Sequence, residues 1–82
     1  MNLRWRNDHH DGQSAYIGAF RLYVAAAYVV STPARKWNAY FNGIPVYRGK
    51  EIAQFETIDE AKGAAVAIAE KTIREAASLL IG

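Results

Sequence analysis

Alternating apolar and polar positions occupy the first two thirds of the chain, and a helical repeat occupies the last third. Runs rich in Tyr, Ile, Phe, Val and Trp predict β-strands over about residues 2–6, 15–30, 36–42 and 44–55. From residue 58 to about residue 80, apolar residues recur at three- and four-residue intervals, which predicts one long helix. We expect a single α+β domain over residues 1–82: an antiparallel β-meander of three to four strands with one long C-terminal α-helix packed on one face.

The junction between the two patterns carries a helix-start signal. Thr57 and Glu60 have the T-x-x-E spacing of a capping box, in which each side chain satisfies a free backbone N–H of the other residue. Asp59 and Glu60 also lie where the helix dipole favours negative charge. The helix should therefore begin at Ile58.

The pair Asn42-Gly43 lies between apolar residues and predicts a two-residue, type I′ hairpin turn. Such a loop pairs Phe41 with Ile44, and continued pairing would bring Asn38 opposite Tyr47 and Trp37 opposite Arg48. Because side chains alternate along strands, the predicted core face holds Trp37, Ala39, Phe41, Ile44 and Val46, together with Phe20, Leu22 and Val24 of the preceding strand. Gly49 marks either a bulge or a second turn.

The predicted helix is longer and more apolar than one sheet requires. It spans roughly 35 Å, whereas a seven-residue strand spans only about 23 Å. Its apolar residues form two neighbouring stripes, one through Ala61, Ala65, Ile68, Thr72, Ala76 and Leu79 and one through Val66, Ala69, Ile73 and Leu80. Either a second copy covers the excess, or a strongly twisted sheet wraps the helix while its last turn frays. The dimer alternative uses Val66, Ile73, Ala77, Leu80 and Ile81.

Charge is divided unevenly along the 82 residues. Residues 1–50 hold seven Lys or Arg and two acidic residues, whereas residues 51–82 hold three Lys or Arg and six acidic residues. The net charge of the whole chain is only +2. A basic segment favours a polyanionic partner. The longest apolar run, residues 22–30, is far shorter than the roughly 20 residues of a membrane-spanning helix. We expect a cytoplasmic protein without a membrane span.

Candidate chemistry is sparse. The chain has no Cys, which excludes disulfides, thiol catalysis and Cys-based zinc sites. The segment Asp8-His9-His10-Asp11-Gly12 offers metal-ligating side chains, but its residue types are also those of an ordinary turn, which we favour. The serines lie in no nucleophile motif, and no phosphate-binding glycine loop is present. We expect no catalytic site, no metal and no cofactor.

The predicted sheet face opposite the core combines aromatic rings with cations. Tyrosine rings can stack on bases while Lys and Arg contact phosphates. The predicted nucleic-acid-binding residues are Arg21, Tyr23, Lys36, Asn38, Tyr40, Tyr47, Arg48 and Lys50. The alternative is that cross-strand aromatic pairs stabilise the sheet without any ligand.

Taken in order, the motifs resemble small phage- and prophage-encoded proteins of uncharacterised function. They are Leu3-x-Trp5, an aromatic strand ending in Phe20-Arg21-Leu22-Tyr23-Val24, Trp37 with its hairpin, and Phe55-x-Thr57-x-x-Glu60-Ala61-Lys62. The resemblance spans most of the chain and implies an antiparallel sheet covered by a C-terminal helix.

The last of these motifs is also similar to the arm-site DNA-binding domain of tyrosine-type phage integrases, in which the sheet reads DNA. A further similarity is to the second half of double-stranded-RNA-binding domains, but Asp59 and Glu60 occupy the position of their basic cluster. Because the chain offers no catalytic motif and a basic, aromatic sheet face, we expect a non-enzymatic binding protein of phage or prophage type. Its expected partners are nucleic acid, a second copy of the chain, or a phage or host protein.

Overall fold

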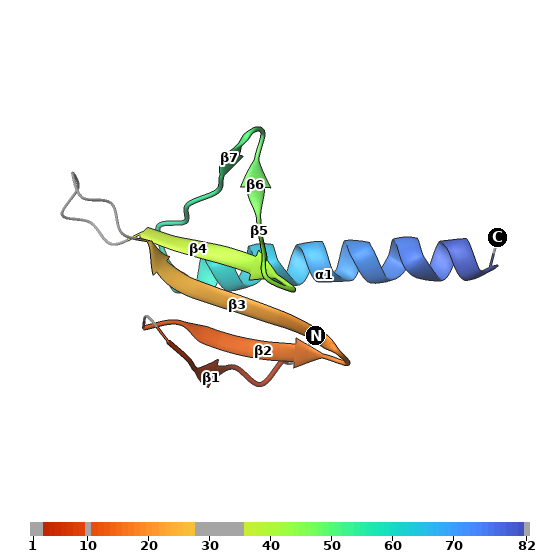
Figure 1. Ribbon diagram of the computed structural model, residues 1–82, viewed down its shortest axis with the longest axis horizontal. Coiled ribbons are helices and arrows are strands. Elements are labelled where there is room, and N and C mark those ends of the chain that lie inside the picture. Colours follow the sequence, from red (N-terminus) through yellow and green to blue (C-terminus); the bar gives the residue numbers. More distant parts are fainter. Residues whose placement is uncertain (1–2, 10, 28–35, 82) are drawn as a thin grey trace.

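The computed structural model describes residues 3–9, 11–27 and 36–81, and its elements form an α+β fold (Figure 1). Five antiparallel strands lie in sequence order in one sheet: β1 (Arg6–Asn7), β2 (Gln13–Ile17), β3 (Phe20–Ala27), β4 (Lys36–Phe41) and β5 (Ile44–Pro45). A separate hairpin consists of β6 (Tyr47–Arg48) and β7 (Glu51–Ile52). The helix α1 (Ile58–Ile81) packs against one face of β3 and β4. The predicted fold class is therefore confirmed.

The region predicted as one strand over residues 15–30 is instead a hairpin. Ala15 on β2 pairs with Leu22 on β3, so the chain reverses between Ile17 and Phe20. Gly18 has a φ of 59° and begins the two-residue turn, a conformation that glycine adopts without steric cost. The prediction of one strand was wrong because β-forming residues on both sides masked this single glycine. Positions 28–30 lie outside the described residues.

The predicted Asn42-Gly43 turn is confirmed. Asn42 and Gly43 have φ angles of 53° and 81°, as a type I′ turn requires, and Phe41 pairs with Ile44. The Asn42 side chain accepts a hydrogen bond from the backbone N–H of Arg21 at 3.0 Å. The backbone N–H of Asn42 donates to the Arg21 carbonyl at 2.7 Å. Asn42 thus fastens the turn to β3.

The predicted pairing beyond Val46 was wrong. Tyr47 pairs with Ile52 rather than with Asn38, and Trp37 exchanges two backbone hydrogen bonds with Phe55 rather than pairing with Arg48. Gly49, with a φ of 66°, makes a second turn, so the chain leaves β4 after Val46 and returns at Phe55. The intervening hairpin projects away from the sheet (Figure 1).

The core lies between the sheet and the first half of α1. Leu22, Val24 and Ala39 of the sheet and Ala61, Ala65 and Ala69 of the helix are all fully buried. The helix contributes only alanines at these positions, and such small side chains let it lie close to the strands. Trp37, Phe41 and Val46 pack around this centre, as predicted. Ile44 does not: it follows the turn at the sheet edge and is 64% exposed.

The N-terminal segment keeps its predicted alternation, although β1 itself is shorter and later than the strand predicted over about residues 2–6. Leu3 and Trp5 pack against the core, whereas Arg4 and Arg6 are exposed. The ammonium of Lys62 lies 5.3 Å from the centre of the Trp5 ring, which links this segment to α1.

The start of α1 is capped as the sequence predicts, with one difference. The backbone N–H of Glu60 donates to Thr57 Oγ1 at 3.1 Å. The Glu60 carboxylate accepts a hydrogen bond from the N–H of Glu56, at 3.3 Å, rather than from that of Thr57. Both contacts satisfy backbone donors at the point where the chain enters the helix.

The second half of α1 extends past the sheet (Figure 1). Every residue from 74 to 79 is exposed, and Leu79 is 84% exposed, so the sheet does not wrap this part of the helix. Ile68, a member of the first predicted apolar stripe, is 36% exposed. Of the predicted dimer residues, Val66 and Ile73 are partly buried and Ala77 is exposed, while the side chains of Leu80 and Ile81 are not among those described. No helix within residues 3–9, 11–27 and 36–81 is apolar over a length that would cross a membrane.

Candidate nucleic-acid interface

The eight residues predicted to bind nucleic acid fall into two separate groups. One group lies on the sheet face opposite α1: Arg21 and Tyr23 on β3, and Lys36, Asn38 and Tyr40 on β4. The other group, Tyr47, Arg48 and Lys50, belongs to the β6–β7 hairpin, because that segment leaves the sheet. The prediction that Tyr47 shares the sheet face with Tyr40 was therefore wrong.

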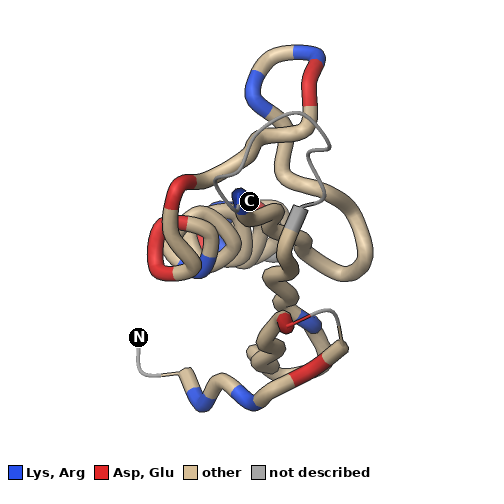
Figure 2. The backbone as a smooth tube through the Cα atoms, turned by 90° about the vertical axis from the view of Figure 1, so that its left-hand side faces the viewer, with Lys and Arg blue, Asp and Glu red and all other residues tan. Residues whose placement is uncertain are grey.

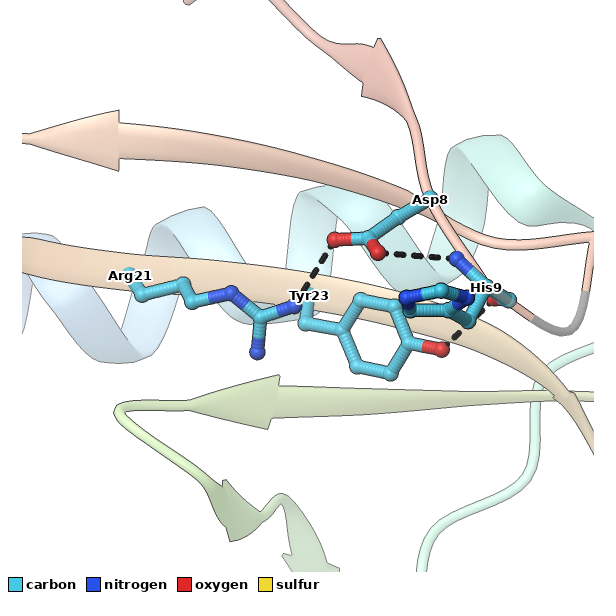
Figure 3. A network of polar contacts seen from close by, with 4 residues as sticks. All are labelled: Asp8, His9, Arg21 and Tyr23. Carbon is cyan, nitrogen blue, oxygen red and sulfur yellow. Dashed lines mark hydrogen bonds and ion pairs between the residues drawn. The ribbon is translucent and has the colours of Figure 1, made fainter.

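Arg21 and Tyr23 belong to a polar network that holds the β1–β2 turn on β3 (Figure 3). Arg21 Nη2 donates to Asp8 Oδ2 at 2.8 Å, and the Arg21 guanidinium lies 4.7 Å from the centre of the Tyr23 ring. The Tyr23 hydroxyl donates to the carbonyl oxygen of His9 at 2.7 Å. Burial raises the pKa of Tyr23, with the nearby Asp8 charge adding to the effect.

The Asp8 carboxylate is the centre of this network. It accepts a hydrogen bond from the backbone N–H of His9 at 2.8 Å as well as from Arg21. The His9 N–H, followed by the side chains of Arg21 and Ser14, lowers the pKa of Asp8 to about 2. The Arg21 guanidinium is thus already paired with a carboxylate of the same chain.

The two ends of the segment from Asp8 to Gly12 are joined by backbone hydrogen bonds, as in the turn that we favoured. The Asp8 N–H donates to the Gly12 carbonyl at 2.9 Å, and the Gly12 N–H donates to the His9 carbonyl at 3.0 Å. Asp11 has a φ of 54°, a conformation common for Asp in turns. The described residues, which exclude His10, contain no group of three potential ligands arranged to hold a metal ion.

The β4 residues of the first group also have internal contacts. Lys36 forms an ion pair with Glu56. The rings of Tyr23 and Tyr40 lie 5.6 Å apart, and Asn38 Nδ2 lies 3.5 Å from the Tyr40 hydroxyl. Because the cations here pair with carboxylates and the rings pack on each other, we infer that this part of the face stabilises the sheet.

A different set of residues, absent from the prediction, gathers at the β1–β2 side of the sheet. Register places Arg6 beside Ser14, and Tyr16 beside Arg21, on the face opposite the helix. Arg4, Arg6, Ser14, Ala15 and Tyr16 line an open hollow of about 360 Å³, which we call the edge hollow. The Tyr16 ring is 61% exposed.

Neither arginine of the edge hollow pairs with a carboxylate among the described residues. The alternation of Arg4 and Arg6 with apolar residues was visible in the sequence. Tyr16 was missed because a continuous strand over residues 15–30 would place it on the core face with Leu22. Once Gly18 reverses the chain, Tyr16 pairs with Arg21 and lies on the face opposite the helix.

The second group lies on a hairpin that extends from the opposite side of the molecule. All residues from Tyr47 to Ile52 are exposed. The Arg48 guanidinium lies 5.8 Å from the centre of the Phe55 ring, at the base of the hairpin. Figure 2 shows the hairpin above the helix, with its Lys, Arg and acidic positions coloured, and the N-terminal segment with its two arginines below.

Comparison of the chain with protein-family models, curated proteins and solved structures gives no match. The resemblances to phage-encoded proteins and integrase arm-site domains therefore stay predictions.

Proposed function

We propose that the protein binds single-stranded nucleic acid at the edge hollow. The observation that carries this proposal is the combination of two arginines without carboxylate partners among the described residues and an exposed Tyr16 ring on one open sheet face. Arg4 and Arg6 would hold phosphates, and the Tyr16 ring would stack on a base. Ser14 also lines the hollow, but its side chain is hydrogen-bonded to the Asp8 carboxylate, so we assign it no ligand contact.

A single strand fits this surface better than a duplex. Stacking on Tyr16 requires an unpaired base whose flat face is accessible. The edge hollow is an open depression on a sheet, where bases can lie flat. Its lining residues include no helix N-terminus and no projecting loop. Arg21, which pairs with Tyr16, and Lys36, farther along the sheet, are excluded from the proposed site because they form ion pairs with Asp8 and Glu56.

Binding is tested by fluorescence anisotropy with a labelled mixed-sequence oligonucleotide of about 20 nucleotides, longer than the sites of about 4–16 nucleotides seen in sheet-based binders. Tyr16→Ala should weaken binding by about fivefold or more, since a stacked base contributes about 1–3 kcal/mol. Arg4→Ala with Arg6→Ala should lower the slope of log affinity against log salt by about 0.7 for each phosphate that the variant no longer neutralises.

Lys71→Ala is the matched control, because Lys71 is an exposed cation on α1, away from the sheet face. It removes the same kind of charge and should leave the affinity for the oligonucleotide unchanged. If Lys71→Ala and the arginine variant lose affinity equally, net charge alone explains the effect. If Tyr16→Ala binds the oligonucleotide as tightly as the wild type, Tyr16 does not stack on a base.

A second candidate function is self-association through the exposed half of α1. The observation in its favour is the 84% exposure of Leu79 on a helix that continues past the sheet. Ile73, Ala77, Leu80 and Ile81 remain the proposed contacts, whereas Val66 packs against the core of its own chain. A homodimer of this kind would suit an accessory protein that acts on a phage or host protein.

Light scattering separates this candidate from the first. A dimer held by apolar helix surfaces should have twice the mass of one chain and persist at high salt, because screening affects charged contacts and not apolar burial. Leu79→Glu should then return the monomer. A monomer at every protein concentration would eliminate this candidate without affecting the first.

A further inference from the structure

The β6–β7 hairpin projects from the sheet as a separate two-stranded ribbon (Figure 1). Its six residues are all exposed, including Tyr47 at 55% and Ile52 at 46%. An isolated two-stranded hairpin gains little stability of its own in water. The ribbon therefore contributes little to the core, and its surface is available for a partner.

The base of the hairpin is held firmly by the body of the protein. The Val46 N–H donates to the Ala39 carbonyl at 2.8 Å, and the Ala53 N–H donates to the Val46 carbonyl at 2.9 Å. Ala53 is buried, and Trp37 and Phe55 exchange backbone hydrogen bonds just beyond it. The direction in which the ribbon points is thus fixed by the core, so little ordering is needed when it binds.

Charge and size indicate the kind of partner. Arg48 and Lys50 lie at the tip on either side of Gly49, with the single acid Glu51 opposite Arg48. Tyr47 and Ile52 form the pair nearer the base. A two-stranded ribbon fits the DNA major groove, which is about 12 Å wide and about 8.5 Å deep. From Val46 to the tip the ribbon reaches about 10 Å.

We propose that the β6–β7 hairpin enters the major groove of duplex DNA, with Arg48 and Lys50 contacting its phosphates or base edges. This is a contact distinct from the edge hollow, because the N-terminal segment that supplies Arg4 and Arg6 to the hollow lies below the helix in Figure 2 and the hairpin lies above it. It goes beyond the proposed binding of single strands and does not depend on it, because the two surfaces share no residue.

The test uses the full chain and a labelled mixed-sequence duplex of about 20 base pairs, roughly two helical turns, with anisotropy measured at several salt concentrations. Arg48→Ala with Lys50→Ala should weaken duplex binding by about tenfold and lower the salt slope by about 0.9 for each phosphate that is no longer neutralised. Glu51→Gln removes the only acid of the ribbon and should tighten binding severalfold. All three residues are exposed, so these variants are expected to fold.

Lys71→Ala again controls for net charge and should leave duplex binding unchanged. The proposal is overturned if the wild-type chain does not bind the duplex, if the hairpin variant binds it as tightly as wild type, or if Lys71→Ala weakens it equally. A parallel titration with the single strand keeps the two proposals apart. Hairpin variants should leave single-strand affinity intact, and Tyr16→Ala should leave duplex affinity intact.

Discussion

Replacing Gly12 by alanine should destabilise the fold strongly. A Cβ at this buried position would lie 2.2 Å from the carbonyl oxygen of Val24, whereas ordinary contacts begin at 3.4 Å. The backbone must therefore retreat by more than an ångström. The same Cβ would also lie 3.0 Å from the His9 carbonyl oxygen and 3.0 Å from the Tyr23 ring, so two further neighbours must shift as well.

The expected cost follows from these contacts. Overpacking typically costs about 1–3 kcal/mol, and loss of the Tyr23 to His9 hydrogen bond adds about 1 kcal/mol. A domain of 82 residues has a free energy of unfolding of only about 4–12 kcal/mol. The two terms together come to about 2–4 kcal/mol, so Gly12→Ala should lower the urea midpoint by about 1.3–4 M, given a slope near 1–1.5 kcal/mol per M.

Urea titration followed by fluorescence of Trp5 and Trp37 measures this change, since both rings pack against the core. Gly63→Ala is the matched control. A Cβ at Gly63 meets nothing within 4 Å, and alanine in an exposed helix position gains about 0.5–1 kcal/mol over glycine. The reasoning is refuted if Gly12→Ala unfolds at the wild-type midpoint, or if Gly63→Ala loses as much stability as Gly12→Ala.

Two further predictions concern the helix start and the β1–β2 turn. Thr57→Ala removes the acceptor for the Glu60 N–H and should cost about 1 kcal/mol in the same urea titration, whereas Thr57→Ser should restore most of it. The pKa of Asp8 is lowered to about 2, so its ionised form stabilises the fold above about pH 4, and that contribution should disappear as the pH falls through about 2. Asp8→Asn should reduce the loss of stability at acidic pH. If the free energy of unfolding of this variant falls with pH as steeply as that of the wild type, other carboxylates are responsible for the loss.

Local signals in the sequence were sufficient for much of the fold. The T-x-x-E spacing placed the start of α1 at Ile58, and Asn42-Gly43 set the first two pairs of the hairpin correctly. Both features depend on residues close together in the chain, where backbone geometry and hydrogen bonding are decided locally.

The errors arose where one glycine redirected the chain. Gly18 and Gly49 each adopt a positive φ and begin turns within segments otherwise rich in strand-forming residues. Missing the first turn concealed the position of Tyr16. At the second, Gly49 had been recognised as a bulge or a turn, but extending the pairing with β4 past Val46 placed Tyr47 on the wrong surface. A two-residue turn inverts the alternation, because Ile17 pairs with Phe20 and Tyr16 with Arg21, so a pattern read straight through the turn assigns residues to the wrong face.

The candidate site changed for a different reason. Arg21 and Lys36 were predicted as ligand contacts because they share a face with tyrosines. Their carboxylate partners, Asp8 and Glu56, come from segments 13 and 20 residues away, and only the tertiary structure brings them together. Arg4 and Arg6 acquire no such partner among the described residues, which shifts the proposed contact to the sheet edge.

The central claim is that a single strand lies on the edge hollow. Its most direct test is a titration of the isotope-labelled protein with a single-stranded oligonucleotide, followed by the amide resonances in two-dimensional NMR spectra. We predict that the shifts concentrate at Arg4, Arg6, Ser14 and Tyr16 and leave residues 74–79 of α1 unchanged. Shifts confined to α1 or to the β6–β7 hairpin, or no shifts at saturating oligonucleotide, would contradict the claim.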